Sequence, residues 1–484
     1  MRVESMPHDL SGFEGESLGL LLFEGDLDGI SCLGDLAPEV RSRVELERFT
    51  GKKESLIKAT FPDGRIKRVI LVGLGKREKA TPDTFRTGAA LIVKEATKSG
   101  AASLALATPT APDALISQAL TEGALLGSYS FDRYRSKKDE PETKIEQVLV
   151  AGGDEGALKR GALFACGQNY ARDLANEPAN VINPLTFSGE AQKVAKEVGL
   201  ECTVYDESHL QGMGMNALLA VGKGSAIPPK FVHLVYRPAE KPAKRVAFVG
   251  KGITFDSGGL NIKPDEHMRG MKGDKMGACN VLAAMRTIAH LRPPVEVHGL
   301  VGLAENMPSG DAYRPDDVIK AYNGKTIEIG STDAEGRVTM ADVLSYASKL
   351  KPDYIIDMAT LTGACIIALG GYMAGLFSND EDFARDLLSA SSRSGERVWR
   401  LPLDDERLRK HIDSPVADVA NVGGRPGGAI TAAMFLQEFV EEDIPWAHLD
   451  VAGVDNYKEP FGYYAKGATG FGVRLFLEWL YSII

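Results

Sequence analysis

The sequence has few of the features that mark secreted or membrane-spanning proteins. It contains five cysteines in 484 residues, an odd and widely spaced set, in a chain too long to need disulfides for a stable core. No segment reaches about 18 uninterrupted apolar residues, and the N-terminal stretch MRVESMPHDL has no basic segment leading into an apolar run. We therefore expect reduced thiols, no membrane association and a cytoplasmic location.

Histidine is scarce as well, and complete nucleotide-binding motifs are missing. The eight histidines are scattered and no HExxH is present, so any metal site should be built from oxygen ligands. GLGK (Gly73–Lys76) lacks the third glycine of a dinucleotide loop, and NGKT (Asn323–Thr326) lacks the upstream glycine of a P-loop. A net charge of −10 also disfavours wholesale binding to nucleic acid.

Short apolar runs alternate with helical patterns along the whole chain, which predicts an α/β protein. The length exceeds the roughly 250–300 residues that one core serves, so we expect two domains. Each should contain a mostly parallel or mixed sheet with helices on both faces. We predict an N-terminal domain over 1–157, a linker helix over 158–177 and a larger catalytic domain over 178–484.

Acidic and basic residues gather where predicted strands of the second domain end. The segments are VGKGITFDSGGLNIKP (Val249–Pro264), MKGDKMGA (Met271–Ala278) and STDAEGR (Ser331–Arg337). Taken singly, each acid is equally consistent with a helix N-cap. Taken together, four carboxylates at one sheet edge would repel one another by several kcal/mol unless cations neutralise them. Two divalent metals would do so and would activate a water molecule for hydrolysis. The four acids are Asp256, Asp274, Asp333 and Glu335.

Three basic residues accompany these acids. Lys251, buried next to metals, should have a lowered pKa and could bind metal as a neutral amine. Lys263 and Arg337 could stay charged and hold an oxyanion or another anion.

These segments resemble signatures of the leucyl aminopeptidase (cytosol aminopeptidase) family. The resemblance rests on the three segments above, on MATLTGA (Met358–Ala364), ARDLANEPANVINP (Ala171–Pro184) and WAHLDVAG (Trp446–Gly453), and on their order and spacing. It extends from about Ala171 to the C-terminus, whereas over the first 160 residues it is only architectural.

The resemblance implies a two-metal exopeptidase that acts on peptides with a free N-terminus. One ion would be held by Lys251, Asp256, Asp274 and Glu335, and the other by Asp256, Asp333 and Glu335. Lys263 would polarise the scissile carbonyl, and Arg337 would hold a bicarbonate ion as general base. Zinc or manganese is the expected metal, with cobalt or magnesium also compatible with these ligands. The family is typically hexameric, so a homo-hexamer is expected.

The resemblance also implies a pocket for the first residue of the substrate, with Leu-type residues expected there. Its lining would comprise Met271, Thr360, Leu361, Gly363, Ala452 and Asp455. The family commonly has an apolar or small residue where this chain has Asp455, and an acid there could favour a basic side chain. Local chain shifts could instead point Asp455 into solvent. Ser331 and Lys275 also depart from the usual Asn and Met of the family.

Two other functions fit part of the sequence. A carboxylate-rich two-metal site could cleave phosphate esters instead of peptides. Basic clusters KREK (Lys76–Lys79) and RYRSKK (Arg133–Lys138) could add DNA binding to peptidase activity, although solvated loops explain both clusters better.

Overall fold

The computed structural model describes residues 1–136 and 144–484. The chain divides into two compact units. The N-terminal unit consists of Met1–Asn169 with two short segments, Arg393–Gly395 and Lys458–Lys466. The C-terminal unit contains the rest of the chain and is the larger of the two. Among the described residues, no helix is long and apolar enough to cross a membrane.

The N-terminal unit is built on a six-stranded sheet with the order β1-β6-β5-β2-β4-β3. Its strands are β1 (Arg2–Met6), β2 (Leu18–Phe23), β3 (Leu56–Thr60), β4 (Arg68–Gly75), β5 (Ser103–Ala107) and β6 (Gln147–Ala151). All neighbours pair in parallel except β3, which runs antiparallel to β4. Its helices are α1 (Ala37–Leu46), α2 (Pro82–Lys98) and α3 (Ala114–Gly127), with α4 (Glu155–Asn176) following β6.

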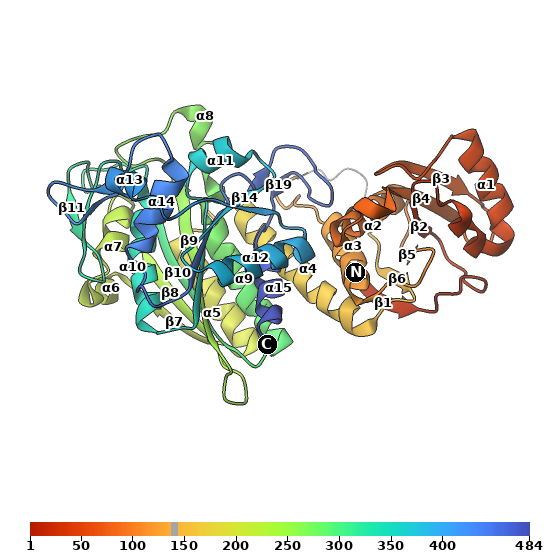
Figure 1. The fold of residues 1–484 in the computed structure, drawn as a ribbon, viewed down its shortest axis with the longest axis horizontal. Helices are drawn as coiled ribbons and strands as arrows, with labels where there is room; N and C mark the ends of the chain where they lie inside the picture. The colour runs from red at the N-terminus through yellow and green to blue at the C-terminus, as the bar shows by residue number, and fades with distance from the viewer. Residues whose placement is uncertain (137–143) are drawn as a thin grey trace. The chain divides into compact units, whose positions relative to one another are not determined.

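Helices cover both faces of this sheet because β2 is apolar on both sides. Leu20 and Leu22 pack into the apolar cluster that contains α1, whereas Leu21 packs into the cluster formed with α2 and α3. Figure 1 shows this unit in red and orange, with α1 and α2 labelled.

The basic clusters of this unit offer less free charge than their sequences indicate. Arg77 forms an ion pair with Asp26 at 2.5 Å and stacks over the ring of Phe23 at 4.2 Å. Of the second cluster, Lys137 and Lys138 lie outside the described residues.

The C-terminal unit is built on an eight-stranded mixed sheet with the order β15-β14-β17-β13-β9-β10-β8-β7. The strands are β7 (Glu201–Tyr205), β8 (Lys230–Tyr236), β9 (Arg245–Asp256), β10 (Glu296–Asn306), β13 (Tyr354–Ala359), β14 (Ala374–Ser378), β15 (Val398–Arg400) and β17 (Trp446–Asp450). The four central strands β17, β13, β9 and β10 are parallel. Their carboxyl ends therefore meet at one edge, where ligands of such sheets collect.

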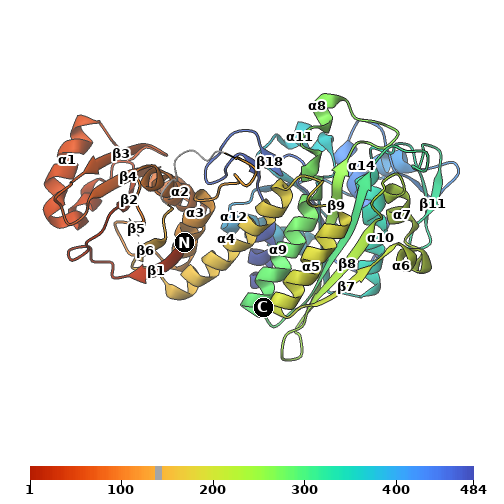
Figure 2. The same cartoon turned by 180° about the vertical axis from the view of Figure 1, so that it is seen from behind.

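Two groups of helices cover this sheet. One face packs against α5 (Pro184–Val198), α9 (Met276–Leu291) and α15 (Val473–Ser482), and Figure 2 shows α5 and α9 lying along it. The other face packs against α7 (Asn216–Gly222), α10 (Glu335–Lys349) and α14 (Gly428–Gln437) in a large apolar cluster. The predicted architecture, an α/β fold with mostly parallel or mixed sheets, is confirmed.

Shorter elements surround the sheet edge and the loops beside it. They include α6 (Glu207–Met213), α8 (Asp265–Met268), the 3-10 helix η3 (Met271–Lys275), α11 (Gly363–Leu369), α12 (Glu381–Ser394) and α13 (Glu406–Arg409). The strands β11 (Val318–Lys320), β12 (Thr326–Glu328) and β16 (Val419–Ala420) form a small three-stranded sheet, and β18 (Asn456–Tyr457) pairs with β19 (Gly467–Ala468).

Candidate metal centre

The four predicted acids lie together at the carboxyl edge of the large sheet. Asp256 is the last residue of β9, Glu335 is the first residue of α10, and Asp333 lies in the loop just before α10. These three residues each bring a carboxylate oxygen within 4.8 Å of the other two. Asp274 lies in η3 and contacts the same lysine as Glu335. The structure thus brings together acids that are up to 79 positions apart in the sequence.

Helix capping does not account for these acids. The residues that precede α9 and α10 make no capping hydrogen bond with their side chains. Asp274 Oδ2 is buried and has no hydrogen-bond partner among the described residues. A buried carboxylate oxygen without a partner is costly, so this atom fits a bound cation.

Two lysines neutralise the acids within the polypeptide itself. Lys251 Nζ lies 2.7 Å from Asp274 Oδ1 and 2.8 Å from Glu335 Oε1. Lys263 Nζ lies 2.8 Å from Asp256 Oδ2 and 2.5 Å from Asp333 Oδ1. Each lysine therefore bridges two carboxylates from different segments of the chain.

The lowered pKa expected of Lys251 applies to a site that holds metals; in the polypeptide without metal the pKa of Lys251 is raised. Burial does act to lower the pKa of Lys251, but the carboxylates of Asp274 and Glu335 outweigh burial and raise it. Burial also acts to lower the pKa of Lys263, but the charge of Asp256 outweighs burial and raises it. Burial also raises the pKa of Glu335, with repulsion from Asp256 adding to the shift. A neutral amine at Lys251 would thus require cations to take over its role beside the acids.

A close approach between α10 and β9 makes the Lys251 contacts possible. A Cβ atom on Gly336 would lie 2.4 Å from Lys251 Cε, so only glycine fits at this position unless the lysine moves. The turn after β9 also depends on glycine, because Gly258 has φ 88° and Gly259 has φ 63°. The turn reverses the chain after Asp256, so that Lys263 lies beside Asp256 and Asp333.

Polar residues also hold the acids in place, and of these Asn306 was not identified from the sequence. Asn306 Nδ2 donates to Asp256 Oδ1 at 2.8 Å and to the Thr332 carbonyl at 2.9 Å. Thr360 Oγ1 donates to Asp274 Oδ1 at 2.6 Å. Asn306 is the last residue of β10 and pairs directly with Asp256. Its position at the end of a strand was the feature of the sequence that could have identified it.

Asn421 fastens the loop that carries Asp333. Its Oδ1 accepts hydrogen bonds from the backbone N–H groups of Gly330 (2.8 Å) and Ser331 (3.3 Å), and its Nδ2 donates to the Ser331 carbonyl (2.7 Å). Its own carbonyl accepts a hydrogen bond from Arg337 Nη1 at 2.8 Å. Asn421 thus fixes the loop 330–334, here called the acidic loop, through its side chain and Arg337 through its backbone carbonyl.

Arg337 lies deep beside the acids. Its side chain is buried, and Nε has no hydrogen-bond partner among the described residues. Burial lowers the pKa of Arg337 to about 10, although Glu335 acts to raise it. A buried guanidinium with a free N–H group is suited to holding an anion.

A cavity of 420 Å³ opens at the acids and contains the predicted pocket residues in its wall. Met271, Thr360, Leu361, Gly363, Ala452 and Asp455 all line it. Asp455 therefore lines the cavity wall. Burial raises the pKa of Asp455 to about 7, and the charge of Asp274 adds to this rise.

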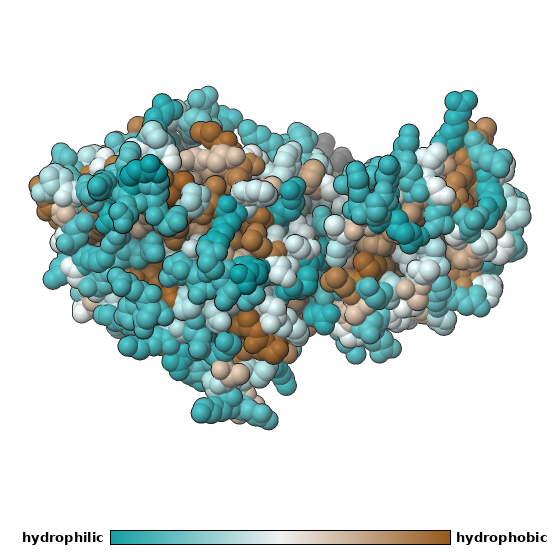
Figure 3. Space-filling model, viewed as in Figure 1, coloured by the Kyte–Doolittle hydropathy of each residue, from teal (hydrophilic) through white to brown (hydrophobic). Residues whose placement is uncertain are grey.

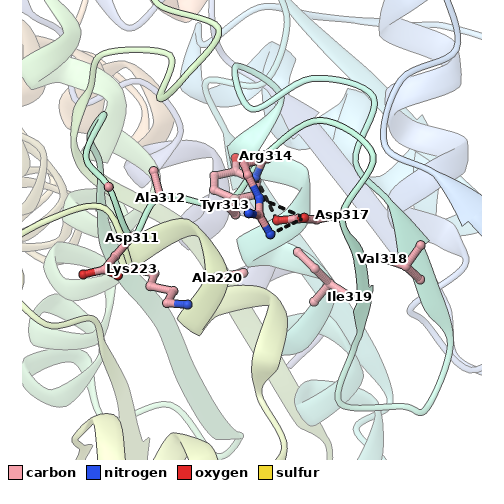
Figure 4. Close-up of a pocket in the computed structure, with 10 residues that line it drawn as sticks. Ala220, Lys223, Asp311, Ala312, Tyr313, Arg314, Asp317, Val318 and Ile319 are labelled. Atoms are coloured by element: carbon pink, nitrogen blue, oxygen red, sulfur yellow. Dashed lines mark hydrogen bonds and ion pairs between the residues drawn. The ribbon is translucent and has the colours of Figure 1, made fainter.

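A second cavity, of 440 Å³, is shown in Figure 4, and none of the predicted site residues line it. Arg314 is paired there with Asp317, at 3.0 Å. Tyr313 lines this cavity and donates a hydrogen bond through its hydroxyl to the Thr332 carbonyl at 2.8 Å. This hydrogen bond holds the acidic loop in place at Thr332.

A cluster of carboxylates beside a cavity, at the carboxyl edge of a mostly parallel sheet, defines a metal-dependent hydrolase. Comparison with known proteins assigns the family. The chain belongs to the cytosol aminopeptidase family: the family's catalytic domain matches residues 169–477 and its N-terminal domain matches residues 33–138. The protein is thus a metal-dependent aminopeptidase, a hydrolase that acts on peptides.

Relatives and solved structures agree with this assignment over nearly the whole chain. A probable cytosol aminopeptidase of Aquifex aeolicus is 56% identical over 486 residues, which is 100% of this chain and 99% of the relative. A tomato leucine aminopeptidase mutant superposes with a TM-score of 0.90 at 34% identity, covering 99% of this chain and 96% of the other. The bottromycin maturation enzyme BotP in complex with Mn gives 0.87 at 38% identity, covering 97% and 99%. Membership of this family favours the peptidase over the phosphoesterase.

Proposed function

We propose that the protein releases N-terminal amino acids from peptides with two divalent ions held at the sheet edge. Lys251, Asp256, Asp274 and Glu335 would hold one ion, and Asp256, Asp333 and Glu335 the other. The observation that carries the proposal is the convergence of the Asp256, Asp333 and Glu335 oxygens within 4.8 Å. The unpartnered Asp274 Oδ2 and the oxygen-rich ligand set support zinc or manganese, with cobalt or magnesium as further candidates.

The ions would supply Lewis-acid polarisation and activation of a water molecule when bound. Lys263 lies beside Asp256 and Asp333, so its ammonium group can donate a hydrogen bond to the scissile carbonyl and to the oxyanion that develops from it. Arg337 would hold a bicarbonate ion, and this ion would supply general-base catalysis when bound. The unpartnered Nε of Arg337 supports this role.

The substrate's free α-amine would lie near Asp274, which limits cleavage to the first residue. The side chain of that residue would enter the cavity lined by Met271, Thr360, Leu361, Gly363, Ala452 and Asp455. Leu-type residues fit its apolar part. The carboxylate of Asp455 in the same wall favours a basic side chain in addition.

The protein would act in the cytoplasm as a homo-hexamer, without nucleic acid as a partner. Apolar side chains at the surface near α11 support self-association (Figure 3), since Ile366 is 43% and Ile367 is 88% exposed. The pairing of Arg77 with Asp26 weakens the case for DNA binding.

The test is hydrolysis of Leu-p-nitroanilide by protein that has been treated with chelator and then supplied with zinc, manganese or cobalt. Activity should return with metal, disappear in Asp333→Ala and be absent with an N-acetylated substrate. Asp382→Ala, which removes an exposed acid from α12, is the matched control and should behave as wild type. Metal-independent activity, or full activity in Asp333→Ala, would refute the proposed centre.

A further inference from the structure

A smaller cavity of 310 Å³ adjoins the metal centre on the side of Arg337. It shares Asp333, Leu361 and Gly363 with the cavity that contains the first-residue pocket. The two cavities are therefore continuous at the acids. Asp274 and Asp455 line only the first cavity, and Arg337 and Arg425 line only the second.

Arg425 has a different environment from the other basic residues of the site. It lies in the Gly-Gly-Arg-Pro-Gly loop between β16 and α14, where Gly424 (φ 83°) and Gly427 (φ 64°) have left-handed backbone conformations. Lys251 and Lys263 are each paired with two carboxylates. Arg425, in contrast, is exposed and makes no hydrogen bond or ion pair with any residue that the structure describes. Its five N–H donors are free for a ligand.

The surroundings of Arg425 favour a negatively charged ligand. The same cavity is lined by the guanidinium of Arg337 and by Gly428, the first residue of the ten-residue helix α14. A helix N-terminus carries partial positive charge. Among the described residues, Asp333 is the one acid that lines this cavity, and it is paired with Lys263 at 2.5 Å. The cavity away from the acids is therefore electropositive.

The proposed function, on which this inference rests, fixes the direction of the peptide. With the α-amine near Asp274 and the scissile carbonyl at the acids, the residue after the scissile bond must extend towards Arg425. We propose that Arg425 forms a carboxylate subsite for this leaving part of the substrate. The carboxylate is either the C-terminus of a dipeptide or the side chain of an acidic second residue, and arginine can bind both through two parallel hydrogen bonds.

Two pairs of substrates test the subsite and distinguish the sources of the carboxylate. Leu-Gly is compared with Leu-Gly-amide, which lacks the C-terminal charge. Leu-Asp-amide is compared with Leu-Asn-amide, which lacks the side-chain charge. If Arg425 binds the carboxylate in one of these pairs, wild type should hydrolyse the charged substrate of that pair with a kcat/KM about tenfold higher than the uncharged one. This is the size expected for a charge-assisted hydrogen bond at an exposed site.

In Arg425→Gln the ratio of kcat/KM values should fall to about one. In Arg425→Lys it should be intermediate, because the charge remains but the planar guanidinium that forms two parallel hydrogen bonds is lost. Arg385→Gln removes the same charge from the surface of α12 and should keep the wild-type ratios. Because Arg425 is exposed and makes no hydrogen bond or ion pair with the described residues, the variants should fold, and circular dichroism checks this.

The inference is overturned if both ratios in Arg425→Gln equal those of wild type. An unchanged ratio together with inactive Asp333→Ala refutes the subsite alone. A ratio that collapses in Arg425→Gln while Asp333→Ala remains active refutes the metal centre and retains the subsite.

Discussion

Replacing Lys251 with methionine tests whether this lysine offsets the buried acids. Its side chain is 4% exposed, and those of Asp274 and Glu335 are 6% and 2% exposed. Lys251→Met keeps the length of the side chain but leaves two carboxylates without their shared cation. Removing one partner of a buried ion pair costs about 3–5 kcal/mol, and a shared lysine should lie towards the upper end of that range.

Thermal unfolding in the presence of chelator measures the effect. A loss of about 4 kcal/mol corresponds to a decrease in Tm of roughly 6 °C for a unit of this size. Lys275→Met is the matched control, because Lys275 is fully buried but its ammonium group donates to the carbonyls of Ala175, Glu177 and Lys272 and to no carboxylate. Without an unpaired charge left behind, this control should lose less, about 1–3 kcal/mol.

The dependence of the loss on pH and metal tests its cause. Without Lys251, the pKa values of Asp274 and Glu335 in the folded protein rise further above their unfolded values. The folded variant then binds more protons than the unfolded chain, so its deficit should shrink as pH falls from 8 to about 5.5. Added Mn²⁺ should also shrink it. A Tm of Lys251→Met within about 1 °C of wild type in chelator, at pH 8, would refute the reasoning.

Three further changes have expected outcomes. Asp455→Met should lower the ratio of kcat/KM for Lys- over Leu-p-nitroanilide about tenfold, since a charge contact worth about 1.4 kcal/mol is lost; an unchanged ratio would place the carboxylate outside the pocket. Asn421→Ala removes three hydrogen bonds from the loop that carries Asp333 and should cost about 2–4 kcal/mol in calorimetry and lower kcat; wild-type kcat would contradict its positioning role. Burial, with repulsion from His298, lowers the pKa of His233 to about 4, so the unfolded chain binds more protons below pH 6.5. Stability should therefore be lost as pH falls from 6.5 towards 4, by up to about 3 kcal/mol, and His233→Phe should flatten a plot of Tm against pH; equal slopes would exclude this histidine as the cause.

Continuous apolar runs in the sequence indicate strands that are buried on both faces, whereas strands at the edge of a sheet lack such runs. RVILVGLG forms β4, which lies between β2 and β3 and is buried from Val69 onwards. The edge strands β1 and β3 are half exposed, and their mixed composition gives no continuous apolar run. Their pairing depends on neighbours that are distant in sequence, which local patterns do not encode.

The acids of the site were predictable because each follows a strand or precedes a helix in a recognisable segment. The residues that hold them were not. Asn306 and Asn421 are ordinary amides in the sequence, and their roles arise only when β10 lies beside β9 and the loop after β16 reaches the acidic loop. The raised pKa of Lys251 also follows from the folded geometry, since it depends on acids 23 and 84 positions away in the sequence.

Because Lys251 and Lys263 neutralise the acids within the polypeptide, folding of the protein does not depend on the metal that its activity needs. A polypeptide that carries its own counter-charges can complete its fold at the ribosome whether or not transition metals are in supply. The amount of protein in the cell would then follow its synthesis, whereas the fraction that works would follow the metal available. Such an arrangement keeps a folded reserve that responds to a rise in metal without new translation.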